Sequence, residues 1–311
     1  MSLPRAVIPG RTYLVTRRCS ERRYFLRPDR ETNNNFLYCL GYAAEKARVG
    51  LTFTCVMSNH HHTGINDHHG TFPEFLERFH SLLARCQNAH LKHAEAFWSN
   101  TATSVVRLVE PEDALDKLVY AFANPAAADL VESIHDWPGA HSFAATISGG
   151  TLTATRPKHF FRDKGVMPET ITLTFERPLG LESLAPADWS TAVQSKLRVT
   201  EDAHRERRRA EGKQVLGRQS ILEQNPLNSH TSPSTRFKIS PKVAAKARPA
   251  MLEAIQENKN FVQRHARSLA DFIAKIPGAL FPYGTYWWQK FAGGVCEPDP
   301  SSSYDPCPAP A

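Results

Sequence analysis

The order in which strand-like and helix-like segments alternate over the first 150 residues constrains the fold more than any other feature of the chain. Apolar patterning predicts strands at 13–16, 51–57, 60–65 and 103–108, and helices at 36–47, 71–86 and 111–124. Gly50 as a stop, a Thr71/Glu74 capping box and Pro111 in a first turn support these helix bounds. The resulting order, β-α-β-β-α-β-α, predicts a ferredoxin-like α+β domain in which an antiparallel sheet carries helices on one face.

The second half of the chain is predicted to be a mostly helical extension. A Ser-Gly-Gly break at 148–150 separates residues 1–150 from residues 151–311. A strand is expected at 171–175 and helices at 186–212, 243–256 and 261–276, and Pro249 is expected to kink or split the second of these helices. Residues 225–240, rich in Pro, Ser, Thr and Asn, predict a linker, and the tail from about residue 297 is predicted to be disordered.

The formal net charge of +7 is unevenly placed, which favours a polyanionic partner. Residues 1–150 carry 15 Lys/Arg and 15 Asp/Glu, whereas residues 151–311 carry 23 and 16. Residues 1–30 hold eight arginines against Glu21 and Asp29. Basic clusters of this kind suit nucleic acid, and a solvated basic surface is the alternative.

Other bulk features narrow the class of protein. No run of 18 apolar residues is present, so no membrane-spanning helix is expected, and the N-terminus has no secretory signal pattern. The six cysteines contain no CxxC pair, which favours reduced thiols over a disulfide or zinc framework. We therefore expect a bacterial cytoplasmic protein, associated with the nucleoid when it is bound to DNA.

The segment Met57-Ser58-Asn59-His60-His61-His62 is the sharpest local motif. On a strand, His60 and His62 point to one face and His61 to the other. Two imidazoles held side by side on a strand can bind one divalent ion. An incidental run of exposed histidines is equally compatible with this segment alone.

The helix predicted at 111–124 brings a second set of functional groups. At about 100° per residue its apolar positions form one stripe, and Asp113, Asp116, Lys117, Tyr120 and Asn124 form the opposite stripe. Tyr120 is therefore either a tyrosine at a solvated helix surface or part of a site. In a site, its phenol would be a nucleophile and the Asn124 amide oxygen, one turn later, a metal ligand.

At this point the chain resembles the REP-associated tyrosine transposases, single-tyrosine members of the HUH transposase family. His60-His61-His62 is similar to the His-hydrophobic-His signature, and Tyr120-Ala121-Phe122-Ala123-Asn124-Pro125 to the catalytic Tyr-x-x-x-Asn-Pro segment. Phe97-Trp98, Asp136-Trp137-Pro138 and Ser142-Phe143 follow the same family order. The resemblance covers roughly residues 8–145. It implies His60, His62 and Asn124 as metal ligands and Tyr120 as the nucleophile.

Three features depart from the family pattern. His61 stands where a bulky apolar residue is usual, so it could compete as a ligand, although the strand alternation points it toward the core. Ser58 replaces a common proline, and the extension after residue 150 exceeds the compact members.

The resemblance implies a single-stranded DNA endonuclease and strand-transferase that acts on hairpin-forming DNA. Attack by Tyr120 would give a covalent phosphotyrosine and a free 3′-hydroxyl, which a second DNA end can reverse without ATP. Mg²⁺ or Mn²⁺ is the expected cofactor, because a bound divalent ion offsets the charge of the phosphodiester. Lys117 could favour the phenolate or contact DNA. The expected assembly is a monomer or a homodimer.

Two basic segments are the candidate DNA contacts. Near the N-terminus, Arg17, Arg18, Arg22, Arg23 and Arg27, interleaved with Tyr24 and Phe25, could follow phosphates and stack on bases. In the extension, the densest cluster is Arg205, Arg207, Arg208 and Arg209. A charged loop and a solvated helix end are the alternatives.

Two other functions compete with the transposase interpretation. A non-cleaving DNA-binding regulator would keep the fold and lose the cleavage reaction. A zinc hydrolase with a His-x-His site is the second, but the chain lacks the eight strand-helix units of the barrel enzymes that use that spacing.

Overall fold

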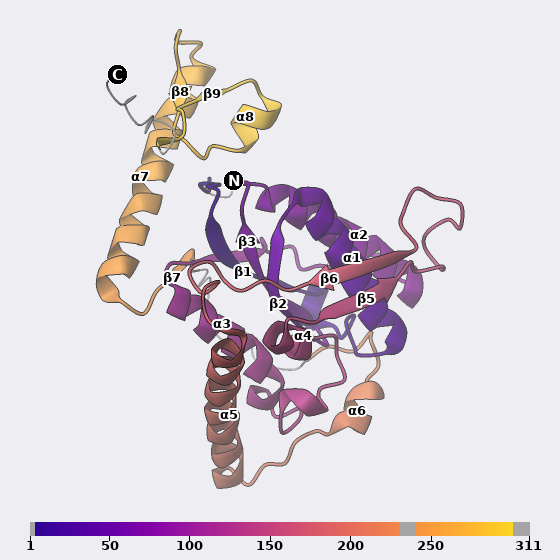
Figure 1. Ribbon diagram of the computed structural model, residues 1–311. Helices are drawn as coiled ribbons and strands as arrows, with labels where there is room; N and C mark the ends of the chain where they lie inside the picture. Colours follow the sequence, from indigo (N-terminus) through magenta and orange to yellow (C-terminus); the bar gives the residue numbers. More distant parts are fainter. Residues whose placement is uncertain (1–3, 231–240, 301–311) are drawn as a thin grey trace, which may run out of the picture. The chain divides into compact units, whose positions relative to one another are not determined.

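A computed structural model describes residues 4–230 and 241–300 of the chain (Figure 1). They form two compact units. The larger unit runs from Gly10 to Lys246. The smaller unit combines residues 4–9 with residues 247–300. No helix among the described residues is long and apolar enough to cross a membrane.

The larger unit is built on a five-stranded sheet with the order β2-β3-β1-β4-β7. Its strands are β1 (Arg11–Arg18), β2 (Gly50–Met57), β3 (His60–Asp67), β4 (Ser104–Leu108) and β7 (Val243–Ala244). The first four pair antiparallel, and β7 pairs parallel with β4. The predicted antiparallel sheet of an α+β fold is thus confirmed for four strands, and the fifth makes the sheet mixed.

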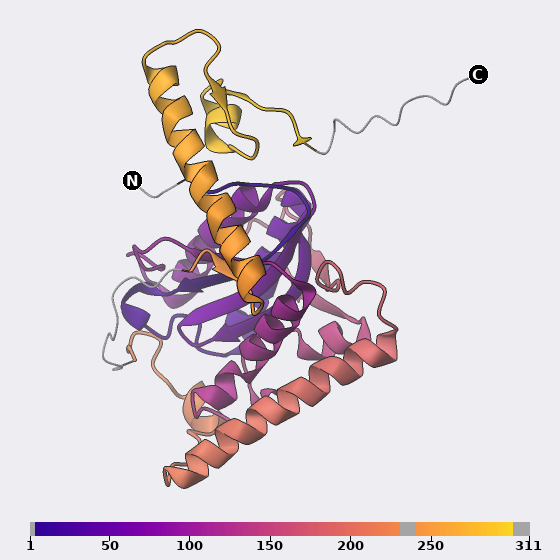
Figure 2. The same ribbon diagram turned by 90° about the vertical axis from the view of Figure 1, so that its left-hand side faces the viewer.

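Helices cover both faces of this sheet, which corrects the prediction of helices on one face. On one face lie α1 (Arg30–Ala47) and α2 (Phe72–Leu91), which pack against each other. On the other face lie α3 (Pro111–Ala127), α4 (Phe143–Ser148) and α5 (Pro186–Ala210). Leu14 and Phe53 of the sheet, Leu118 of α3 and Leu197 of α5 belong to one buried cluster. Figure 2 shows α5 as the long salmon helix that runs beside α3.

The short elements of the larger unit complete its surface. They are the 3-10 helices η1 (Ser20–Arg22) and η2 (Ile134–Asp136), the hairpin β5 (Thr151–Thr155) and β6 (Thr170–Thr174), and α6 (Arg218–Leu222). The hairpin packs against α1. The Ser-Gly-Gly segment at 148–150 is therefore a turn between α4 and β5 and not a gap between compact units. The compact unit continues to Lys246 because α5 completes the core against α3.

One predicted helix signal has another role, and one real helix cap was not predicted. Thr71 precedes α2 but makes no side-chain cap; its hydroxyl donates instead to the Ala47 carbonyl at 2.6 Å. The N-cap that the sequence prediction missed is Asp29, whose carboxylate accepts from the Thr32 amide and starts α1 six residues before the predicted bound of 36.

The smaller unit contains α7 (Arg248–Ile273), β8 (Leu280–Phe281), α8 (Trp287–Phe291) and β9 (Val295–Cys296). Helix α7 is continuous, so the predicted split is wrong: Pro249 lies in the first turn, where its missing N–H is tolerated. Phe281 is fully buried and packs against Phe272 and Trp288. Glu297 accepts from Arg264, so residues 297–300 are ordered against this unit, contrary to the predicted disorder. Residues 301–311, like residues 231–240 of the predicted linker, lie outside the described residues.

Candidate active site

Strand β3 carries the three consecutive histidines, and its pleat sends them to opposite faces of the sheet. His60 and His62 lie on the face covered by α3, with ring centroids 4.9 Å apart. His61 lies on the other face, against Phe36 of α1 and Phe79 of α2. The predicted alternation of these side chains is confirmed, and it keeps His61 away from the other two rings' open nitrogens.

Hydrogen bonds decide which nitrogen of His60 and His62 carries the proton. His60 Nδ1 lies 2.7 Å from the Asn59 side-chain oxygen, which can only accept, so Nδ1 donates. The Asn124 side-chain nitrogen, which can only donate, lies 3.2 Å from His62 Nε2. His62 Nδ1 therefore donates to Thr16 Oγ1 at 2.8 Å. Both rings keep an unprotonated Nε2, the form that binds metal ions.

Burial keeps both rings neutral. Loss of solvent, together with the positive charge of Arg18, lowers the pKa of His60 to about 4. Burial also holds the pKa of His62 well below its usual value, with contributions from His60, His61 and Lys117. A neutral imidazole leaves its lone pair available at neutral pH, so proton competition for the two Nε2 atoms is weak.

Tyr120 stands on α3 beside His62. Its ring centroid is 5.4 Å from that of His62, and Lys117 Nζ lies 5.5 Å from the tyrosine ring. The apolar stripe of α3, at Leu115, Leu118, Val119 and Phe122, is buried as predicted, whereas Tyr120 is 49% exposed. The helix thus points its phenol outward from a fixed backbone.

Asp113 departs from the exposed stripe on which it was predicted. Its carboxylate accepts from the backbone amides of Glu110 at 3.0 Å and Lys246 at 2.8 Å, and the side chain is buried. Asp113 therefore closes a capping box at the start of α3 and ties the helix to the chain beyond β7. Its role is structural.

Behind the site, His61 belongs to a buried polar network that the sequence did not reveal. Its Nε2 lies 3.1 Å from His80 Nε2, and its Nδ1 lies 3.0 Å from Thr63 Oγ1. Arg17 reaches the other nitrogen of His80 at 3.1 Å and lies over the Trp98 ring. These partners explain how a histidine is tolerated in a fully buried position.

Other motif residues support β2 rather than reach the site. The Trp137 indole donates to the Val56 carbonyl at 2.9 Å, and the Ser142 hydroxyl accepts from the Thr54 amide at 2.8 Å. The segment around them covers the outer edge of β2, which would otherwise expose unpaired backbone groups. Their role is to hold the β2–β3 pair that carries the histidines.

The N-terminal arginines do not form one free surface. Arg18 is exposed and lines the cleft beside His60 and His62. Arg17, Arg22, Arg23 and Arg27 are half-buried. Arg17 belongs to the His80 network, Arg23 pairs with Glu21 at 2.6 Å, and Arg27 pairs with Asp29 at 2.8 Å. Phe25 is buried against Phe97, so it cannot stack on a base, and Tyr24 is half-buried.

The arginines at the end of α5 mostly hold the fold together. Arg208 is 2% exposed and contacts Asp129 and Glu132, which follow α3. Arg207 and Arg205 pair with Asp129 and Glu132 respectively. Arg209 is exposed. Within this cluster, Arg208 cannot contact DNA, because its guanidinium is buried and paired with Asp129 and Glu132.

Two clefts share Tyr120. One, of about 630 Å³, is lined by the two ligand-candidate histidines together with Arg18, Lys117 and Ser104. The other, of about 570 Å³, lies between α3 and α5 and is lined by Lys196, Val199, Thr200 and His204. The phenol can therefore be reached along either cleft.

The donor set around His60 and His62 fits a divalent ion in part. Among the described residues, no group of three or more His, Cys, Asp or Glu side chains could hold a metal ion. Two neutral imidazoles with unprotonated Nε2 atoms are suitable ligands for Mn²⁺, once the Asn124 side chain that donates to His62 Nε2 turns away. Asn124 is the adjacent amide, although its nitrogen rather than its oxygen faces His62. A metal held here would complete its coordination with water or a phosphate oxygen.

No family profile and no curated protein sequence matches this chain. Two solved structures are similar to parts of its fold. One is a REP-associated tyrosine transposase bound to a REP hairpin, with a TM-score of 0.40 and 13% identity over 54% of this chain and 94% of that one. The other is a presumed transposase from Deinococcus radiodurans R1, with a TM-score of 0.29 and 20% identity over 38% of this chain and 93% of that one. At these values neither likeness assigns a family to the chain.

Proposed function

We propose that this protein is a metal-dependent endonuclease and strand-transferase for single-stranded, hairpin-forming DNA, with Tyr120 as its nucleophile. One observation carries the proposal. An exposed tyrosine on a rigid helix stands beside two neutral histidines whose Nε2 atoms are unprotonated, in a cleft that Arg18 and Lys117 make basic. This combination suits attack on a phosphodiester better than attack on an uncharged substrate.

The reaction exchanges one ester for another. The Tyr120 oxygen attacks phosphorus, the new bond is a phosphotyrosine, and the bond from phosphorus to the 3′ oxygen breaks. The phenolic proton leaves to solvent, and the departing 3′ oxygen takes up a proton to become a hydroxyl. A 3′-hydroxyl from a second strand reverses these steps, which joins the strands without an external energy source.

His60 and His62, with Asn124 beside them, would hold Mg²⁺ or Mn²⁺. When bound, the ion would offset the phosphate charge and orient the scissile group. Residues of the chain would supply the other functions of the site. Thr16 and Asn59 fix the tautomers of the two rings, and Arg18 and Lys117 place positive charge in the cleft where the phosphodiester would lie.

The experiment is incubation of the purified full chain with a 3′-labelled hairpin oligonucleotide and Mn²⁺, followed by denaturing gel electrophoresis. A covalent protein–DNA adduct is expected for the wild type and not for Tyr120→Phe, which removes only the hydroxyl. The matched control is Tyr42→Phe, because Lys46 lies over the Tyr42 ring at 5.6 Å just as Lys117 lies near Tyr120. Among the described residues, Tyr42 has no ring contact with a histidine.

The outcomes separate the proposal from its alternative. An adduct that survives in Tyr120→Phe overturns the assignment of the nucleophile. A wild-type protein that binds the hairpin but forms no adduct with Mn²⁺ or Mg²⁺ is a non-cleaving DNA-binding regulator. Of the two features that favour that alternative, His61 and the long extension, His61 faces away from His60 and His62, against Phe36 and Phe79.

A further inference from the structure

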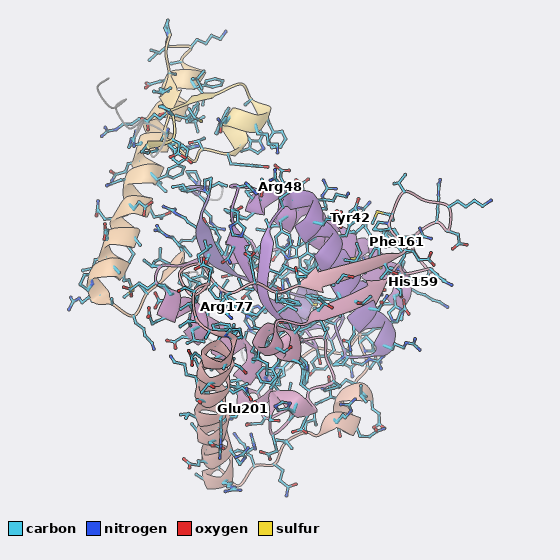
Figure 3. The ribbon with its side chains drawn as sticks, in the orientation of Figure 1. Tyr42, Arg48, His159, Phe161, Arg177 and Glu201 are labelled. Atoms are coloured by element: carbon cyan, nitrogen blue, oxygen red, sulfur yellow. The ribbon has the colours of Figure 1, made fainter. Side chains whose placement is uncertain are left out.

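A second basic cleft lies on the larger unit, where the start of α1, the end of α2 and the hairpin β5–β6 meet. It encloses about 790 Å³ and is lined by Arg30, Lys92, Arg156, Lys158 and His159 among others. Figure 3 labels His159 and Phe161 on this side of the molecule, where the chain leaves β5. These elements belong to the sheet face of α1 and α2, whereas Tyr120 belongs to the face of α3.

One carboxylate, Glu31, lines this cleft, and it lies 3.2 Å from His159 Nδ1. Arg30, Lys92 and Lys158 are exposed, and no side-chain hydrogen bond or ion pair engages them among the described residues. With Arg156, four cationic side chains line the cleft against one carboxylate, which leaves a local field that attracts an anion.

The position of Arg30 is unfavourable for folding alone. It is the first residue of the 18-residue helix α1, where the helix dipole is positive and a cation is destabilising. The same end of a helix favours phosphate. Asp29 and Glu31 lie at the same helix end, and a bound anion would add to them in offsetting the positive charge there.

The lining of the cleft argues against a single-stranded occupant. Sites for single strands combine cations with exposed rings on which bases stack. No Phe, Tyr or Trp is among the described residues that line this cleft, and Phe161, which follows His159 in the chain, is half-buried against Tyr38, at 5.3 Å between centroids, and against Phe160 at 4.8 Å. Cations without an available stacking ring suit the backbone of a double helix, whose bases are already stacked.

We propose that this basic cleft binds the phosphate backbone of a double-helical DNA segment, such as the paired stem of a folded strand. The inference rests on the proposed function only in taking DNA as the substrate. It adds a second contact on the sheet face opposite Tyr120, through Arg30, Lys92 and Lys158. A stem held there would restrain the DNA while an unpaired strand occupies the tyrosine clefts.

The test compares two triple variants of the full chain. The cleft variant is Arg30→Gln, Lys92→Gln and Lys158→Gln. The control variant is Arg218→Gln, Arg48→Gln and Arg78→Gln, which removes the same charge from exposed positions. Arg218 also opens a helix, and Arg48, like Lys92, is a left-handed helix cap. Arg30→Gln removes a cation from the positive end of a helix, so it does not weaken folding.

The measurement is binding of a blunt 20-base-pair duplex and of an unstructured single strand, by fluorescence anisotropy over a range of salt concentrations. For the duplex, each lost phosphate contact lowers the slope of log K against log salt by about 0.9, so the cleft variant is expected to lose about 2–3 units of slope. The control variant should keep the wild-type slope, and single-strand binding should change little in either variant.

Three outcomes overturn the proposal: an unchanged duplex slope in the cleft variant, an equal loss in the control variant, or an equal loss on the single strand. Adduct formation with a short single-stranded oligonucleotide is measured in parallel. Adducts with an unchanged duplex slope refute the cleft and leave the proposed function standing. A lowered slope without adducts refutes the proposed function and leaves the cleft standing.

Discussion

Replacing His61 tests whether the two faces of β3 have separate roles. His61→Ala removes a fully buried ring and leaves His80 Nε2 without its partner, whereas Thr63 Oγ1 keeps its contact with Thr54 Oγ1. Emptying a core position costs about 2–5 kcal/mol, and each buried polar group left unpaired costs about 1–3 kcal/mol. These contributions overlap, so we expect a loss of about 4 kcal/mol in the free energy of unfolding.

For a unit of this size, 1 kcal/mol shifts the melting temperature by about 2–4 °C, so His61→Ala should melt roughly 8–16 °C lower. His61→Leu refills the space and leaves only His80 Nε2 unpaired. It should therefore lose about half as much free energy of unfolding as His61→Ala. His60→Ala and His62→Ala, on the other face, should instead lose adduct formation while they keep most of their stability.

The assay is thermal unfolding by circular dichroism together with the adduct assay at low temperature, where all variants are folded. His61→Ala should form adduct at close to the wild-type level per folded molecule. A His61→Ala protein with a wild-type melting temperature and no adduct would refute the separation of the two faces, as would equal loss of activity in all three alanine variants with stability unchanged.

Other changes probe the supports of the site and of the fold. Thr16→Val removes the acceptor that orients His62 and should lower Mn²⁺ affinity by about 10–100-fold, measured by titration calorimetry. Asn124→Ala should weaken it less than loss of either histidine, because water can replace an amide oxygen. Arg208→Met leaves two carboxylates without their buried partner and should cost about 2–3 kcal/mol of stability, measured by urea unfolding. This is below the range for a fully buried pair, because the carboxylates stay partly exposed. The control Arg209→Met should cost under about 0.5 kcal/mol in the same measurement. Burial lowers the pKa of His141 to about 4, below the value of about 6.5 in the unfolded chain. The contribution of the neutral His141 ring to stability is therefore fully present above about pH 6.5 and is lost as pH falls toward 4. His141→Gln should therefore reduce the difference in melting temperature between pH 7 and pH 5, and an unchanged difference would contradict this assignment.

The sequence predicted those features that depend on local periodicity. The three histidines were predicted to alternate because a strand has a period of two, and Tyr120 was predicted to lie opposite Leu118 because a helix has a period of 3.6. Both hold in the structure. Features set by distant pairing were not predictable. The register that brings Thr16 opposite His62, and the approach of α2 that brings His80 to His61, join segments tens of residues apart.

The same limit explains the errors of the sequence analysis. Arg208 was predicted to be an exposed cation because its neighbours in the sequence are charged. In the structure it points from α5 toward Asp129 and Glu132, which lie far away in the sequence. The Ser-Gly-Gly turn at 148–150 was interpreted as a domain boundary from its local composition alone. The contacts that place the following hairpin against α1 join segments far apart in the sequence, so local composition does not show them. The apolar pattern of a helix does not show which side of a sheet the helix covers, so all the helices were predicted on one face, whereas α3 lies on the face opposite α1 and α2.

Because two clefts share Tyr120, the covalent intermediate of the proposed reaction has two routes along which DNA ends can leave or arrive. In the proposed reaction, one DNA end stays bonded to the tyrosine and the other ends in a free hydroxyl. With an open cleft on each side of the residue, the free end can depart along one cleft while the bonded end remains in the other. Resealing and transfer then compete for one intermediate, and their ratio depends on how fast the free end leaves relative to the arrival of a new one. Substitutions at Val199 or Thr200, on the α5 side, would shift the product ratio without altering the rate of the first cut.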